Sequence, residues 1–203
     1  MRLDAGLHAF GRLLPEHPRA DAWCVAGELE RQALLARDAA ANEITVVGDL
    51  VAEAIASVHR AQPGAPHGVA LVRESLSVTD RAWLEQATPV GLPWLACPAR
   101  DAGVAPWIAH VAAARVVCTD SVGWQRVAVA LGVPCVVHPT ADLWAPGVAA
   151  SLVMQHGTRE LLQQIVERAA RLPRGKPAEA TGVGARIVDV LLGPARAFKG
   201  HAA

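Results

Sequence analysis

The sequence has no excess of charge and no long uninterrupted apolar run. Its 203 residues carry 19 basic and 19 acidic side chains, so nothing in the charge predicts binding to a nucleic-acid backbone. Hydrophobic residues make up 52 % of the chain, but Pro, Gly, Arg and Asp interrupt them before any run reaches membrane-spanning length. The N-terminus also lacks the apolar core of a secretion signal. These absences predict a soluble, cytoplasmic protein with neither a nucleic-acid nor a membrane partner.

Cysteine is scarce, and tyrosine is absent altogether. The four cysteines, Cys24, Cys97, Cys118 and Cys135, stand far apart, and the eight histidines are equally dispersed. A metal site needs clustered ligands, so we expect no metal, and we expect no cofactor. Each cysteine lies in an apolar, strand-like context, which is typical of a small buried side chain in a reducing compartment.

Strand-like and helix-like segments alternate along the chain. Strands are expected at 21–26, 43–47, 68–72, 94–97, 116–118 and 152–154, and helices at 28–40, 50–59, 79–87, 106–113, 158–172 and 184–192. Gln62–Pro66 is rich in turn-forming residues and is the best candidate for a boundary. Such alternation predicts the α/β class, with a mainly parallel sheet covered by helices on both faces.

The most informative stretch runs from Val117 to His138. It starts with a buried strand, after which Thr119–Ser121 supplies a turn and a helix N-cap. Gly123 lets a ligand approach the backbone, and Gly132 ends the helix before Pro134 opens the next strand. A helix N-terminus beyond the carboxyl end of a parallel strand is a place where phosphates bind. The stretch therefore predicts a Rossmann-like, nucleotide-binding half-fold.

This stretch resembles the Thr-Asp-Ser-Gly-Gly-x-Gln-Glu-Glu-Ala-x-x-Leu-Gly-x-Pro signature of the non-hydrolysing UDP-N-acetylglucosamine 2-epimerases. The positions in register are Thr119, Asp120, Ser121, Gly123, Gln125, Ala128, Leu131, Gly132 and Pro134. Further segments resemble the family in the same order, namely Asp4–Leu7 with Phe10, Ile44–Asp49, Ala105–Ile108, Gly182–Gly184 and Arg186–Asp189. The resemblance implies one half of a GT-B-like architecture of two domains. Residues 1–62 would be a remnant of the first domain with the crossover segment, and residues 63–203 a Rossmann-like nucleotide-binding domain.

The resemblance also implies a reaction. In the family, a first-domain carboxylate takes the proton at C2 of the sugar, and UDP is eliminated and added back to the other face of a glycal. Asp4 falls at one such carboxylate position, with Asp in place of Glu, and Glu16 falls near a second. A shorter side chain displaces the base from the proton that it must take. The alternative for Asp4 is a solvated residue near a frayed terminus.

Several family residues are replaced here. Arg126 and Val127 stand at the two Glu positions of the signature, where relatives bind the ribose, and Val122 replaces its first Gly. The catalytic His expected after the strand at 69–72 is absent, and Arg73–Glu74 stand there instead. In the loop at 139–146, Trp144 takes the position of the second Arg. These changes predict weakened or lost 2-epimerase activity.

The replacing residues could bind a changed ligand. Arg126 and Arg73 could pair with a diphosphate, and Trp107 and Trp144 could stack on a base. For Arg126 the alternative is a solvated position on the helix face, and for each tryptophan a core or hinge-packing role. The candidate ligand-binding set is Ser121, Val122, Gly123, Gln125, Arg126, Trp107, Arg73 and Trp144.

Two classes of function remain open. The first is an enzyme, or half of a split enzyme, that acts on a UDP-N-acetylhexosamine. The resemblance implies that such an enzyme takes part in cell-surface polysaccharide biosynthesis. The second is a non-catalytic relative that binds a nucleotide or a partner through the same half-fold. The expected partners are UDP or a UDP-sugar, and either a second copy in a homodimer or a partner chain that supplies the first domain.

Overall fold

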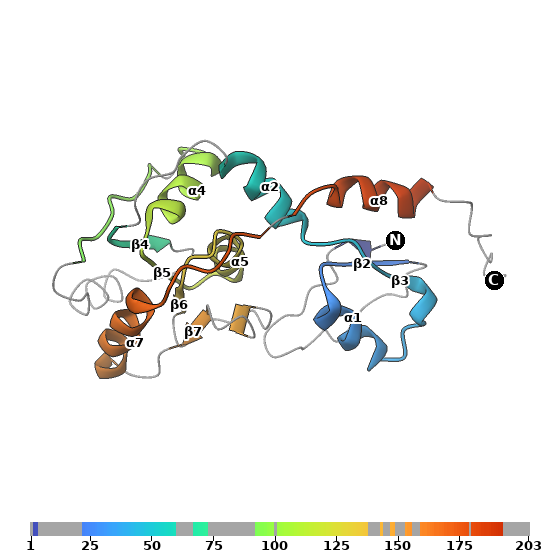
Figure 1. Cartoon of the computed structure of the whole chain (residues 1–203), viewed down its shortest axis with the longest axis horizontal. Coiled ribbons are helices and arrows are strands. Elements are labelled where there is room, and N and C mark those ends of the chain that lie inside the picture. The colour runs from blue at the N-terminus through green and yellow to red at the C-terminus, as the bar shows by residue number, and fades with distance from the viewer. Residues whose placement is uncertain are drawn as a thin grey trace.

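The computed structural model describes residues 2–3, 22–59, 67–72, 92–99, 101–137, 143, 147–148, 153–155, 159–178 and 180–192. Within these ranges the chain forms one parallel sheet of three strands and another of four, each with its own helices (Figure 1). The predicted helix at 79–87, the linker at 62–66 and most of the loop at 139–146 lie outside the described residues. The predicted division of the chain at residue 62 stays a prediction.

The larger sheet has the order β4-β5-β6-β7 and is parallel throughout. Its strands are β4 (Val69–Val72), β5 (Val116–Thr119), β6 (Cys135–Val137) and β7 (Val153–Gln155). Because β5 pairs with a neighbour on each side, the strand that leads into the signature helix is internal, as predicted. The α/β class and the parallel sheet are confirmed.

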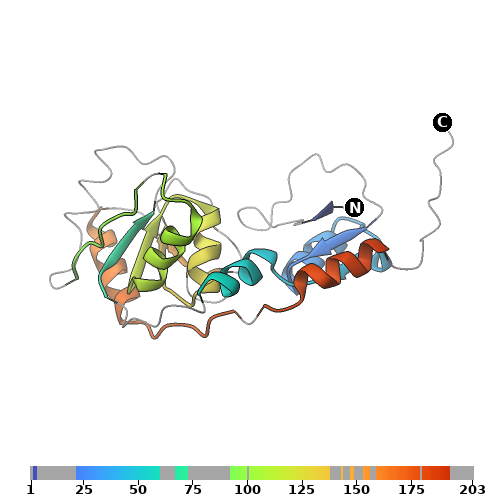
Figure 2. The same ribbon diagram turned by 90° about the horizontal axis from the view of Figure 1, so that it is seen from above.

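Side chains of the larger sheet alternate between its two faces. Val117 packs in a cluster with α2 (Leu50–His59), α4 (Val104–Ala113) and α5 (Val122–Ala130). Its neighbours Val116 and Cys118 pack instead with α7 (Arg159–Arg171). Figure 2 shows this sheet between its helices. A strand that is covered on both faces is expected to be apolar along its length, which explains the buried Val116-Val117-Cys118 run.

Gly132 closes the signature helix, as the sequence predicted. Its φ of +67° lies in the left-handed region that favours glycine. Its backbone is also closely packed, because a Cβ built on it would lie 2.1 Å from the carbonyl oxygen of Gly175. The Gly175 N–H donates to the Gly132 carbonyl at 2.8 Å. The segment after α7 is thereby fixed against the end of α5.

The smaller sheet has the order β1-β2-β3, with β1 at Arg2–Leu3, β2 at Trp23–Val25 and β3 at Ile44–Val46. On one face, Trp23 and Val25 pack with Leu34 of α1 (Glu28–Leu35). On the other, Cys24 packs with Val183 and Ile187 of α8 (Val183–Leu192). The last described helix therefore returns to the first sheet (Figures 1 and 2).

Helix α2 connects the smaller sheet to the larger one, and it also forms hydrogen bonds with the N-terminus of α8. The Glu53 carboxylate of α2 accepts hydrogen bonds from the backbone N–H groups of Val183 and Gly184, each at 2.9 Å. The Gly184 N–H contributes most to holding the pKa of Glu53 below its ordinary value. A further hydrogen bond joins α8 to the smaller sheet: Arg186 Nε donates to the carbonyl of Val47, the residue directly after β3, at 2.8 Å. Glu53 thus supplies the negative charge that a helix N-terminus favours.

Most predicted bounds agree with the structure to within two residues, but two predictions differ more. Helix α1 stops at Leu35 rather than Ala40, because Asp38 has a φ of +61° and the chain reverses there. The strand predicted at 94–97 is wrong, since Trp94 forms only a single bridge to Val69. Pro93 and Pro98 bracket that segment, and neither has an N–H to continue a ladder. Helix α2, by contrast, has the predicted bounds.

Candidate functional site

The signature element forms as the sequence predicted. Strand β5 is buried along its whole length, and Ser121 is the N-cap residue of α5, with an extended backbone. The Ser121 side chain makes no capping hydrogen bond. Instead, the Ser121 N–H donates to Thr119 Oγ1 at 3.1 Å, which fixes the turn between strand and helix. The first N–H groups of α5 therefore emerge at the carboxyl end of an internal strand, an arrangement that binds anions in many α/β proteins.

The first turn of α5 is open at Gly123. This residue is exposed, and a Cβ built on it would meet only Ser121 Oγ, at 3.5 Å. Val122 begins the helix, and the only described non-glycine residue with a positive φ is Asp38. The backbone at position 122 therefore does not require glycine, so the β-branch of Val122 is tolerated there.

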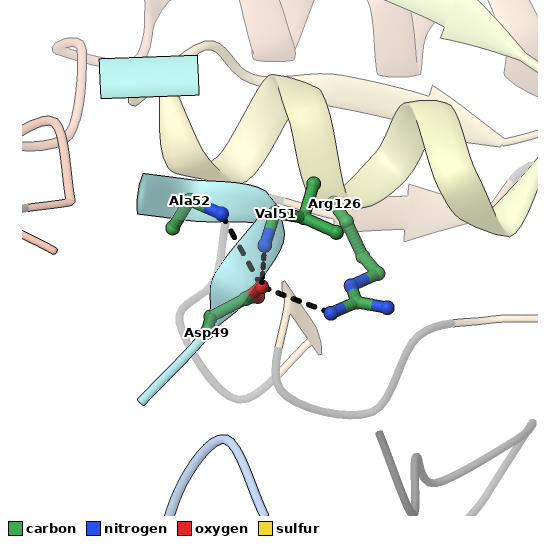
Figure 3. A network of polar contacts seen from close by, with 4 residues as sticks. All are labelled: Asp49, Val51, Ala52 and Arg126. Atoms are coloured by element: carbon green, nitrogen blue, oxygen red, sulfur yellow. Dashed lines mark hydrogen bonds and ion pairs between the residues drawn. The ribbon is translucent and has the colours of Figure 1, made fainter. Parts of the chain in front are cut away.

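Gln125 and Arg126 follow on the same helix but differ in environment. Gln125 is wholly buried, so a ligand that contacts it would have to reach the interior. Arg126 lies near the surface, where its Nη2 forms an ion pair of 2.9 Å with Asp49 Oδ1 (Figure 3). Roughly a sixth of each side chain is exposed, 16 % and 18 % respectively. Arg126, the cation predicted to pair with a diphosphate, is therefore already paired with Asp49 of the same chain.

Asp49 is a residue that the sequence interpretation did not assign to the site. It lies between β3 and α2, and its Oδ1 accepts hydrogen bonds from the N–H groups of Val51 at 2.8 Å and Ala52 at 3.2 Å (Figure 3). An aspartate directly before a helix is a recognised capping signal, so its cap was predictable. Its ion pair joins residues 77 positions apart, and no local pattern indicates such a contact.

Glu30 of α1 is a second carboxylate in this region, and it is buried. Burial is the main cause that raises its pKa, and the negative charge of Asp49 adds to the rise while Arg126 opposes it. A Cβ at Gly27 would lie 3.3 Å from Glu30 Oε2, so the carboxylate folds back over the start of its own helix. Residues from α1, α2 and α5 thus form one electrostatic group, which we call the Glu30–Asp49–Arg126 group.

Trp107 belongs to an aromatic cluster between α4 and α5. Its ring lies edge-on to His110, with centroids 5.8 Å apart, and tilted against Trp124 at 6.0 Å. Trp107 and Trp124 are both half-buried. This packing accounts for the position of Trp107 without a ligand, and its predicted stacking on a base stays a prediction.

Four predicted site residues, Asp4, Glu16, Arg73 and Trp144, lie outside the described residues. The ligand role of each remaining candidate also stays a prediction. Among the residues that the structure does describe, no group of His, Cys, Asp and Glu could hold a metal ion. In that same part of the chain, no helix has the length and apolarity to cross a membrane.

The cysteines divide into buried and exposed positions. Cys24, Cys118 and Cys135 are buried, as predicted, whereas Cys97 is exposed, contrary to prediction. Burial raises the pKa of the Cys118 thiol to about 12. Cys97 lies in the segment where the predicted strand did not form, and its exposure agrees with that position. The buried thiols serve as packing groups of the two sheets.

The sequence matches no family model and no curated protein, but solved structures share its fold. UDP-GlcNAc 2-epimerase of Methanocaldococcus jannaschii, in complex with UDP-GlcNAc and UDP, matches with a TM-score of 0.67 at 18 % identity, over 93 % of this chain and 67 % of the other. A putative UDP-N-acetylglucosamine 2-epimerase from Listeria monocytogenes matches with a TM-score of 0.60 at 16 % identity, over 85 % of this chain and 59 % of the other.

The enzyme from Neisseria meningitidis, bound to UDP-GlcNAc, matches with a TM-score of 0.56 at 17 % identity, over 85 % of this chain and 61 % of the other. The chain thus spans less than two thirds of the Listeria and Neisseria proteins. At these identities the similarity establishes the fold. The chain is structurally related to the UDP-GlcNAc 2-epimerases and has their GT-B-like α/β architecture.

Proposed function

We propose that this chain binds UDP or a UDP-N-acetylhexosamine at the N-terminus of α5, with 2-epimerase activity that is weakened or lost. The observation that carries the proposal is the open first turn of α5 at the carboxyl end of β5, within the fold of an enzyme crystallised with UDP-GlcNAc and UDP. Backbone N–H groups at such a position bind phosphate without help from any particular side chain. A cytoplasmic location and a role in cell-surface polysaccharide synthesis belong to the same proposal.

Weakened activity follows from the charges around the site. Elimination of UDP places negative charge on the departing diphosphate, and fixed cations or N–H donors stabilise that charge. Here Arg126 already pairs with Asp49, and the position of the family's catalytic His carries Arg73. If the reaction runs, Asp4 is the candidate that takes the C2 proton as UDP leaves C1. Re-addition of UDP at C1 then returns to C2 a proton that exchanges with solvent.

The alternative is a non-catalytic nucleotide-binding or partner-binding relative, or one half of a split enzyme. It is supported by the coverage, because the chain spans 59 % to 67 % of the three epimerase structures described above. Size-exclusion chromatography with light scattering distinguishes a monomer from a homodimer. Co-purification with a chain that completes the smaller sheet would favour the split enzyme.

The binding test uses calorimetry with UDP and UDP-GlcNAc and the variant Gly123→Val. The position is exposed and has room for a Cβ, so the fold should persist, while the added side chain crowds the N–H groups of Ser121–Gly123. The matched control is Ala185→Val, at an exposed residue in the first turn of α8, where Glu53 already takes the N–H groups. We expect Gly123→Val alone to weaken binding by about tenfold or more. Equal affinity in all three chains would contradict the proposed site.

Activity is tested by incubating UDP-GlcNAc with the chain in deuterated water. Proton removal at C2 introduces deuterium even where no net epimerisation follows. We expect little or no incorporation. Robust incorporation that disappears in Asp4→Asn would overturn the loss of activity and would identify Asp4 as the working base.

A further inference from the structure

A single carboxylate oxygen holds together the start of α2 and the middle of α5. Asp49 Oδ1 accepts the Val51 and Ala52 N–H groups and also contacts Arg126 Nη2, at 2.8, 3.2 and 2.9 Å (Figure 3). The first two contacts cap a helix and need only an acceptor atom. The third is an ion pair and needs the negative charge.

In the Glu30–Asp49–Arg126 group, the two groups that interact with Arg126 are carboxyls. Asp49 touches it, and the charges of both Arg126 and Asp49 act on the buried Glu30. A guanidinium with a carboxylate partner attracts an incoming anion much less than one without, because the two charges cancel at a distance. Burial strengthens this effect, since the pair is mostly screened from water by protein.

We propose that Asp49 is an internal counter-ion that sets the affinity of the site for a diphosphate. This inference rests on the proposed nucleotide site at α5. A diphosphate that binds at the first turn of α5 competes with Asp49 for Arg126. When it wins, Arg126 turns from Asp49 to the ligand. Asp49 meanwhile keeps its two backbone hydrogen bonds, so α2 stays capped while the ion pair with Arg126 is exchanged.

The variant Asp49→Asn separates the charge from the cap. Asparagine caps helices as well as aspartate does, so its side-chain oxygen still accepts from Val51 and Ala52. It carries no charge, so Arg126 loses its ionic partner. The matched control is Glu28→Gln, which removes one negative charge from an exposed carboxylate of α1 that pairs with Arg31. Thermal unfolding of each variant verifies that the fold is retained.

The experiment is calorimetry of wild type, Asp49→Asn, Glu28→Gln and Arg126→Gln with UDP and with inorganic pyrophosphate, at two salt concentrations. We expect Asp49→Asn to bind both ligands about tenfold more tightly, with a steeper loss of affinity in high salt. Glu28→Gln should bind as wild type does, and Arg126→Gln should bind more weakly. Binding by Asp49→Asn alone, with wild type too weak to measure, would support the inference most strongly.

Three results would overturn the inference. Equal or weaker binding by Asp49→Asn, with binding by wild type intact, would remove Asp49 as a competitor and leave the nucleotide site standing. Wild-type affinity in Arg126→Gln would remove Arg126 from the site, with the same consequence. No binding by any chain at millimolar ligand would remove the nucleotide site together with the inference.

Discussion

The two sheets of this chain reach stability in different ways. The four-stranded sheet has fully buried residues such as Val69, Val117 and Val137, and its covering helices lie between or beside its own strands in sequence. The three-stranded sheet is covered on one face by α1 and on the other by α8, whose residues lie more than a hundred positions away. The larger sheet is therefore mostly self-sufficient, whereas the smaller one depends on a distant helix.

The polar contacts show the same difference. Within the described residues, α8 is tied to the first half of the chain by Glu53 and Arg186. Helix α5 is tied to the same half by Arg126 and Asp49. Both connections meet at α2. The smaller sheet is therefore expected to open first, and α2 is the element through which that opening would affect the nucleotide site.

The largest effect on stability is expected at Gly132, where the end of α5 packs against Gly175 in the segment after α7. In Gly132→Ala the new Cβ would meet the Gly175 carbonyl at 2.1 Å in a backbone with positive φ, so strain and overpacking add. We expect a loss of about 2–5 kcal/mol in the free energy of unfolding, measured by urea titration. The control Gly103→Ala also has a positive φ but has no atom within 4 Å, and should lose only about 1–3 kcal/mol. Equal losses would show that the contact with Gly175 adds nothing.

A matched pair of core truncations compares the two sheets directly. Ile108→Ala removes a buried side chain of the larger sheet's cluster, and Ile187→Ala removes one that packs on the smaller sheet. Each should cost about 2–5 kcal/mol, with Ile108 at the upper end. The readout is alkylation of buried thiols in a Cys97→Ser background. Ile187→Ala should accelerate the labelling of Cys24 but not of Cys118. Equal acceleration at both thiols would mean that the sheets open together.

The smallest effect on stability is expected from two glutamates, Glu53 and Glu30. Their pKa values are shifted in opposite directions, so their contributions to stability depend on pH in opposite ways. Hydrogen bonds from the N-terminus of α8 lower the pKa of Glu53, so its contribution to stability is present above pH 4.5 and is lost as pH falls through the lowered pKa. Burial raises the pKa of Glu30, so its favourable contribution is present below pH 4.5 and is lost as pH rises through the raised pKa.

At pH 7, therefore, Glu53→Gln should lower the unfolding midpoint in urea, whereas Glu30→Gln should leave it unchanged or raise it. The difference between Glu53→Gln and wild type should shrink in acid. Unfolding curves between pH 3 and pH 7 measure both trends. A loss of stability in Glu30→Gln at pH 7 would show that its ionised form is favoured by the fold.

Local sequence patterns predicted the elements that local physics decides. The strand, N-cap and glycine stop around α5 were all predictable, because each depends on neighbours in the chain. The reversal at Asp38 was not, because the sequence there has no glycine to indicate a left-handed residue. Nor was the single bridge at Trp94, where an apolar segment looked like a strand although prolines bracket it.

The site was predicted in its backbone but not in its charges. The position of Ser121–Gly123 at the carboxyl end of β5 follows from the strand–turn–helix pattern. The pairing of Arg126 with Asp49, and the proximity of Glu30 to both, depend on how α1, α2 and α5 come together. Side chains from three separate segments leave no common spacing in the sequence, so only the folded structure brings them into one group.

Because α8 covers one face of the smaller sheet, that sheet cannot complete its core until α8 has been synthesised. A ribosome makes β2 and β3 well over a hundred residues before Val183 and Ile187, which cover Cys24. Until then, the face that α8 covers in the structure lacks that helix and is accessible to chaperones or to other nascent chains. The four-stranded sheet can assemble meanwhile from neighbouring segments. The three-stranded sheet is thus expected to complete its core after the four-stranded sheet, although its strands precede those of the larger sheet in the chain.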